Sequence, residues 1–160
     1  MLEKNCTKFV ILALAWLWPL VVSASSADAP LLTVQAGSER PSLTLDRQSL
    51  LTLPQASMET RVPWHDQPAK FEGPLLNTLV KHLGVRGETL VITGLDGYST
   101  RISLDESTAM NAMLAHRCNG KALGIRDLGP LLLLLPEGYG LSTQQRLFRT
   151  VWQVTHIVVE

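Results

Sequence analysis

The dipeptides Asp96-Gly97 and Asn119-Gly120 constrain the fold most, because each marks a tight turn between two β-rich segments. Asp-Gly and Asn-Gly are the strongest short-range signals of a β-hairpin, since both residues of the favoured turn take a positive φ. The first dipeptide lies between "TLVITG" and "YSTRISL", and the second lies between "AMLAHRC" and "KALGI". The sequence therefore predicts two hairpins and a protein rich in antiparallel strands.

Further β-rich segments and one helical pattern complete the predicted domain. Apolar residues recur at helical spacing after Gly73, with Pro74 suited to the first helical position and Gly84 to the left-handed position beyond the end. Asp46 is expected to cap a helical turn or two that Pro54 ends. Extended segments are expected at "LLTVQA", "SLTL", "QASMETRV" and "VWQVTHIVV", and "LLLLLP" is expected as a central strand covered on both faces. These elements predict an α+β domain of mixed or antiparallel β-sheets with few short helices.

The first 24 residues have the composition of a secretory signal peptide. Two lysines precede an apolar run of 14 residues, and small residues follow it. This run is shorter than the roughly 20 residues that a membrane-spanning helix needs. Cleavage after Ala24 or after Ala27 fits the small-residue rule, and an uncleaved N-terminal anchor is the alternative. We therefore expect a signal peptide at residues 1–24, a single domain at residues 25–160, and a periplasmic protein that does not span the membrane after cleavage.

Charge and cysteine content exclude several classes of protein. Without residues 1–24, the chain keeps 12 basic and 13 acidic side chains, so it offers no electrostatic basis for binding nucleic acid. Cys6 lies in the predicted signal peptide, which leaves Cys118 as the single thiol of the mature chain and excludes an internal disulfide. The glycine-rich nucleotide motifs, His-Glu-x-x-His and Cys-x-x-Cys are absent from the sequence.

Few remaining side chains suggest chemistry by their spacing. His116 and Cys118 are two residues apart, so they would share one face of a strand. This placement is compatible with a metal pair or a base-activated thiol, and a buried cysteine beside a hairpin is the simpler alternative. Trp64 and Trp152 are expected in the core, and His82 is expected to face solvent on the predicted helix.

The order of the motifs is more informative than any single motif. From residue 43 to residue 159 the chain runs through "LTLDRQSLLTLP", "TRVPW", "FEGPLLNTLV", "LDGYSTRISL", "NGKAL", "LGPLLLLLP" and "VWQVTHIVV". This order resembles the molybdopterin-binding domain of the sulfite oxidase family, the oxidoreductase molybdopterin-binding domain, and most of all its small exported members. The resemblance implies an α+β fold of mixed sheets, with a pterin cofactor in a cleft lined by loops.

The sequence departs from the catalytic members of this family at two places. Their molybdenum is held by a thiolate in the stretch that aligns with residues 60–63, which here reads Thr-Arg-Val-Pro and has no thiol. They also often carry His-Gly-x-Pro-x-Arg before the late strand, where this chain has "LGPLLLL" with Leu128 near the histidine position. That exchange removes donors for an anionic phosphate. The cofactor is left open: molybdopterin is the candidate, and both departures count against it.

Three functions follow from these observations. The first is a non-catalytic exported module that binds a small molecule or a protein partner, as the periplasmic part of a membrane sensor or redox protein would. The second is a molybdopterin-dependent oxidoreductase with altered cofactor ligands, and the third is a metal or thiol site built on His116 and Cys118. We favour the first and assign no catalytic residue and no metal ligand. What remains of the family's pocket is the predicted binding surface, and its residues are Arg61, Trp64, His65, Phe71, Asp96, Tyr98, Asn119 and Arg126.

Overall fold

The computed structural model of the protein describes residues 29–37 and 41–160. The predicted signal peptide and both of its cleavage sites lie outside these residues. Within the two described ranges, no helix is long and apolar enough to cross a membrane.

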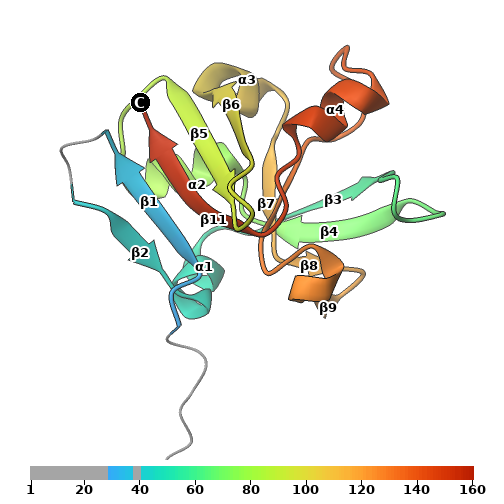
Figure 1. The fold of residues 1–160 in the computed structure, drawn as a ribbon, viewed down its shortest axis with the longest axis horizontal. Helices are drawn as coiled ribbons and strands as arrows, with labels where there is room; N and C mark the ends of the chain where they lie inside the picture. The colour runs from blue at the N-terminus through green and yellow to red at the C-terminus, as the bar shows by residue number, and fades with distance from the viewer. Residues whose placement is uncertain (1–28, 38–40) are drawn as a thin grey trace, which may run out of the picture.

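A five-stranded mixed sheet forms the larger part of the domain (Figure 1). Its strands are β1 (Leu32–Ala36), β2 (Leu43–Leu45), β5 (Thr89–Gly94), β6 (Ser99–Ser103) and β11 (Val154–Val159), in the order β2-β1-β11-β5-β6. Only the central pair β1 and β11 is parallel, and the other three pairs are antiparallel. The predicted β5–β6 hairpin is confirmed. The mixed α+β architecture is confirmed as well.

A four-stranded antiparallel sheet extends away from the mixed sheet, on the right in Figure 1. Its strands are β3 (Ala56–Thr60), β4 (Ala69–Gly73), β8 (Arg117–Cys118) and β9 (Lys121–Ala122), in the order β3-β4-β8-β9. Strands β8 and β9 pair through Arg117 with Ala122 and Cys118 with Lys121, so the second predicted hairpin is confirmed. This hairpin, β8–β9, projects below β4 in the figure.

A two-stranded sheet of β7 (Met113–Ala115) and β10 (Leu132–Leu134) separates two hydrophobic cores. Successive leucines of the "LLLLLP" segment point to opposite sides of the strand. Leu131, Leu133 and Leu135 join the core of the mixed sheet, and Leu132 and Leu134 join the core under β4. The prediction of a strand buried on both faces is correct, but its central place in a sheet is wrong. Within the described part of the chain, β10 pairs with β7 and forms one further isolated bridge, from Leu133 to Val151.

The predicted helices form with small shifts at their ends. Helix α1 (Arg47–Thr52) is capped by Asp46, whose carboxylate accepts a hydrogen bond from the backbone N–H of Ser49 at 2.7 Å. Helix α2 (Leu76–His82) begins two residues after Pro74, which is therefore not the first helical residue. The carbonyl of Pro74 accepts from Leu114 N–H at 2.9 Å, so this stretch is held against β7 before the helix can start.

Two helices escaped prediction although their caps are visible in the sequence. Helix α3 (Leu104–Ala109) is capped by Ser103, and helix α4 (Thr143–Arg149) begins with a capping box of Ser142 and Gln145. Ser-x-x-Glu and Ser-x-x-Gln before such segments are the expected signals of a helix start. Helix α4 lies above β3 and β4 in the view of Figure 1.

Candidate functional site

A cavity of about 500 Å³ lies beside the β8–β9 hairpin, and we call it the hairpin cavity. Its walls come from the loop after β3, from β4, from the hairpin itself and from a 3₁₀ helix at Ile125–Asp127. Five of the eight predicted site residues line it, namely Trp64, His65, Phe71, Asn119 and Arg126. The predicted binding surface lacked the other lining residues, most of which lie close to the Asn-Gly turn: Cys118, Lys121, Ala122, Leu123, Asp127 and Leu128.

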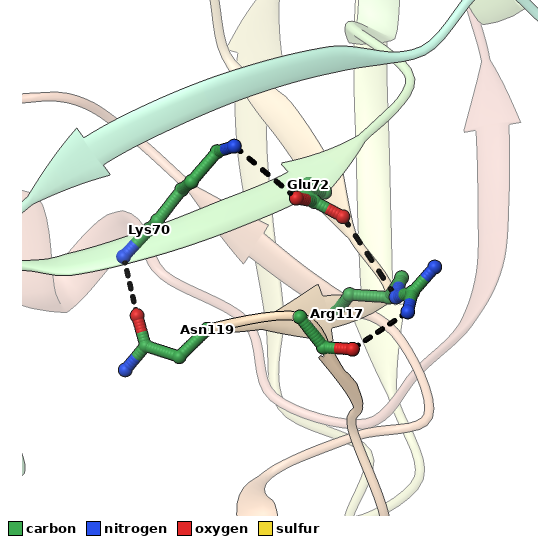
Figure 2. Close-up of polar contacts among 5 residues, drawn as sticks. Lys70, Glu72, Arg117 and Asn119 are labelled. Carbon is green, nitrogen blue, oxygen red and sulfur yellow. Dashed lines mark hydrogen bonds and ion pairs between the residues drawn. The ribbon is translucent and has the colours of Figure 1, made fainter.

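Hydrogen bonds fix the hairpin against β4 (Figure 2). Asn119 accepts a hydrogen bond from Lys70 N–H through its side-chain oxygen at 2.9 Å, and its own N–H donates to the Lys70 carbonyl at 2.7 Å. Glu72 lies between Lys70 and Arg117, with ion-pair distances of 3.5 and 3.7 Å. Arg117 also donates to the carbonyl of Gly120 at 2.6 Å. The side-chain oxygen of Asn119 thus serves the fold, and the hairpin presents a fixed wall to the cavity.

The opposite wall is anchored to the start of the last strand. Gln153 donates its backbone N–H to the carbonyl of Leu128 and its side-chain N–H to the carbonyl of Ile125, both at 3.0 Å. Gly129 N–H donates to the Gly124 carbonyl at 2.8 Å and closes the loop. These bonds hold the 3₁₀ helix that carries Arg126 and Asp127 at the edge of the cavity.

Cys118 contacts a histidine, but this histidine is His65. The Sγ atom of Cys118 lies 3.7 Å from Nε2 of His65, whose ring packs edge-on against Phe71. Partial burial raises the pKa of the Cys118 thiol, and the nearby carboxylate of Asp127 raises it further. The thiol is therefore protonated at neutral pH.

His116 occupies a different environment from Cys118. It lies between β7 and β8, is only 4% exposed, and its Nε2 lies 2.9 Å from Oε1 of Gln55. Gln55 donates its amide hydrogens to the carbonyls of Leu50 and Leu53, which orients its oxygen toward the imidazole and makes His116 the donor. The alternative of a site built on His116 and Cys118 together is not supported, because the two side chains make separate contacts, with Gln55 and with His65. Among the described residues, no group of three or more His, Cys, Asp or Glu side chains is placed to hold a metal ion.

His116 should make stability depend on pH. Burial lowers its pKa, the positive charges of Arg47 and Arg117 lower it further, and Glu72 opposes them. Its contribution is fully present above the unfolded-state pKa of about 6.5 and is lost as the pH falls from there through the lower folded-state pKa. We expect the free energy of unfolding to decrease between about pH 7.5 and about pH 5, a range that brackets the pKa of an unfolded histidine. Urea denaturation at several pH values would measure this decrease. The decrease should be smaller in His116→Gln and unaltered in the exposed-site control His82→Gln; equal slopes in all three proteins would contradict the assignment.

The remaining predicted site residues lie outside the hairpin cavity. Asp96 and Tyr98 line a groove of about 380 Å³ between the β5–β6 turn and α4, and we call it the aromatic groove. Its other lining residues are Leu147, Phe148, Thr150 and Trp152. Arg61 faces α4 in a space of only about 10 Å³.

Neither predicted core tryptophan is fully buried. Trp152 is 46% exposed, and Trp64 is half-buried. Their rings meet edge to face at 5.8 Å, so Trp64 lies between the hairpin cavity and the aromatic groove.

The mixed sheet, the antiparallel sheet beside it and the loop-lined cavity define a domain with the sulfite oxidase-like molybdopterin-binding fold. Residues 32–153 match the family model of the oxidoreductase molybdopterin binding domain, and the chain belongs to that family. The crystal structure of the sulfane dehydrogenase SoxCD from Paracoccus pantotrophus is similar, with a TM-score of 0.62 and 19% sequence identity. The match covers 86% of this chain and 39% of that one, so the chain spans well under half the length of that protein. No curated protein matches the chain.

Residues 60–63, which the resemblance places at the metal ligand, do not offer the donor that a molybdenum centre needs. Thr60 is 3% exposed, and its hydroxyl has no hydrogen-bond partner, but a hydroxyl is a hard donor that does not replace a thiolate. Arg61, Val62 and Pro63 face α4 across the space of about 10 Å³, which has room for about one water molecule. None of these four residues lines the hairpin cavity.

Proposed function

We propose that the protein is a non-catalytic, exported binding module that takes a small anionic molecule in the hairpin cavity. One observation carries the proposal: the hairpin cavity is lined by aromatic and basic side chains, while residues 60–63 contain no thiol and do not line it. Export to the periplasm is proposed from the composition of residues 1–24.

The cavity is suited to an anion with a flat body. Lys121 and Arg126 both line it, and neither takes part in an ion pair among the described residues. Trp64 lines the same cavity from the loop after β3, and its indole ring offers an apolar surface for a planar group. Asp127 is the single acidic side chain in the lining and opposes the two cations only in part.

Measuring the molybdenum and pterin content of the purified protein tests whether it carries molybdopterin. The protein should be purified from the periplasm of a host that makes molybdopterin, and then analysed by elemental mass spectrometry and by fluorescence of the oxidised pterin. We expect no stoichiometric molybdenum. Pterin without metal would support binding in the cavity and name the ligand. Stoichiometric molybdenum would overturn the proposal in favour of an oxidoreductase with altered ligands.

Removing Arg126 should weaken anion binding. Thermal shift and calorimetric titration against inorganic phosphate, pyrophosphate and nucleoside monophosphates should identify an anion that binds the wild-type protein. Arg126→Ala or Lys121→Ala is expected to weaken that binding by a factor of about ten, because each removes one charge-assisted contact. Arg61→Ala is the matched control and should bind as wild type, because Arg61 lies in a separate pocket. Equal losses in all three variants would argue against the cavity.

The aromatic groove favours a second role, the binding of a protein partner. Phe148 is 64% exposed, and Tyr98 and Trp152 are nearly half exposed, which is unusual for neighbouring aromatic side chains on one surface. A membrane sensor or redox protein with a periplasmic part is the partner class we propose. A photo-crosslinking amino acid at position 148 should then give one discrete product in the periplasm, and the same group at Arg86 should give none.

A further inference from the structure

We propose that Cys118 is a site of reversible S-thiolation, which forms a mixed disulfide with a small disulfide carrying carboxylates. The proposal rests on the proposed function in one respect, since both use the hairpin cavity and its cations. It goes beyond that function because it assigns a covalent reaction to a named atom.

The thiol lies where a small disulfide can reach it. Cys118 is half-buried in the wall of the hairpin cavity, and its Sγ is in contact with Nε2 of His65 at 3.7 Å. The volume of about 500 Å³ falls within the range of small-molecule sites in proteins. Cys118 therefore lines a space of the size that small molecules occupy.

Charged groups around the cavity select for anionic reagents. Lys121 is three residues from Cys118 across the Asn-Gly turn, and Arg126 lies on the facing 3₁₀ helix. Both can attract the carboxylates of a disulfide that enters the cavity. Asp127 and partial burial keep the thiol protonated at rest, which protects it from indiscriminate oxidation.

The reaction is a thiol–disulfide exchange. His65 Nε2 accepts the proton of Cys118, and the thiolate attacks one sulfur of the small disulfide. A new S–S bond to Cys118 forms as the old S–S bond breaks, and the leaving thiolate takes a proton. One protein thiol and one small disulfide therefore give one mixed disulfide and one small thiol. Residues 25–160 contain no second cysteine, so no internal thiol can displace the adduct, and an external thiol must reverse it.

Two aromatic disulfides of different charge test the role of the cations. The chain of residues 25–160, in which Cys118 is the single thiol, is treated with 5,5′-dithiobis(2-nitrobenzoate), which is dianionic, and with 4,4′-dithiodipyridine, which is neutral, and both reactions are followed by absorbance. We expect the ratio of the anionic to the neutral rate constant to fall by a factor of about ten in the Lys121→Ala/Arg126→Ala double variant, and to fall with added salt. The ratio should stay at the wild-type value in Arg86→Ala, because Arg86 is exposed and remote from the cavity.

A change of His65 tests its part in proton transfer. In His65→Gln the rate constant with the neutral reagent should fall most near neutral pH and approach the wild-type value in alkaline solution, where the thiol ionises unaided. A purely structural role would lower it equally at all pH values, and that result would overturn the role of His65.

Treatment with oxidised glutathione gives the direct readout. Intact-mass and peptide mass spectrometry should find one glutathione adduct on Cys118 in the folded protein, released by dithiothreitol and absent from Cys118→Ser. An adduct that forms only after denaturation, or a charge ratio unaffected by removing both cations, would overturn the proposal. Molybdenum content tests the proposed function separately, so the failure of one can be told from the failure of the other.

Discussion

Replacing Gly73 with alanine is expected to destabilise the protein by about 3 kcal/mol or more, a large part of the total stability of a domain this size. Gly73 ends β4, where the strand passes over β7. A Cβ atom at this position would lie 2.1 Å from the carbonyl oxygen of Leu114 and 2.8 Å from the Cα of Ala115. Both atoms belong to the backbone of β7, so no side-chain rotation can relieve the overlap. Urea denaturation of the purified variant would measure the loss.

Gly84→Ala is the matched control for this prediction. Gly84 follows α2 at a φ of +64°, and a Cβ atom there would meet nothing within 4 Å. Its cost is therefore the left-handed backbone alone, about 1 kcal/mol. If the two variants lost the same stability, the close approach of β4 to β7 would not be the cause.

The same close approach links the fold to the candidate site. Gly73 is adjacent to Glu72, which pairs with Lys70 and Arg117 and so helps to hold the β8–β9 hairpin. Any Gly73→Ala protein that still folds must displace β4 from β7. We therefore expect it to lose anion binding in the hairpin cavity as well as stability.

Local turn chemistry made the two hairpins predictable from sequence. Asn119-Gly120 forms the two-residue turn between β8 and β9, and Asp96-Gly97 lies in the four-residue connection 95–98 between β5 and β6. Each dipeptide thus marks the connection between two paired strands. The segment "AMLAHRC" was expected as one strand, but it divides at His116 into β7 and β8, which belong to different sheets. At the point of division, His116 contacts Gln55, which lies 61 positions earlier in the sequence, and no local pattern indicates this contact.

The pairing of distant strands explains which residues of the candidate site could be predicted. Trp64, His65, Phe71, Asn119 and Arg126 meet because β4 pairs with β8, a contact between distant segments that agrees with the family resemblance. Asp96, Tyr98 and Arg61 were grouped with them, but α4 separates these residues into two other pockets, and α4 was not predicted.

The exposure of Trp152 follows from a local irregularity of the backbone. Gln153 has a φ of +51°, and the register of β11 shifts between Val154 and His156. Val154 is buried two residues after Trp152, and the positive φ of Gln153 between them breaks the alternation that would have placed the indole on the same side as Val154. Neither feature has a signature such as Gly or Pro in the sequence, so the apolar run "VWQVTHIVV" predicted a regular strand.

Replacing a leucine on either face of β10 with alanine should lower the free energy of unfolding by about 2–5 kcal/mol, because both faces are buried. Leu133 is fully buried in the core of the mixed sheet, and Leu132 is 1% exposed in the core under β4. Leu133→Ala and Leu132→Ala remove the same number of atoms from neighbouring positions of one strand. We expect similar losses in the free energy of unfolding by urea denaturation, since each leaves a cavity that rigid neighbours fill only in part.

The two variants should differ in their effect on Cys118. Leu132 packs in the core that Phe71 belongs to and that Cys118 packs against, whereas Leu133 packs on the far side of β10. Local opening near the thiol needs only the smaller core to loosen. Leu132→Ala should therefore speed the reaction of Cys118 with a neutral disulfide reagent in the absence of urea, and Leu133→Ala should do so much less at matched stability. Equal acceleration would mean that the thiol is exposed by global unfolding, and that β10 does not divide the domain into two cores that open separately.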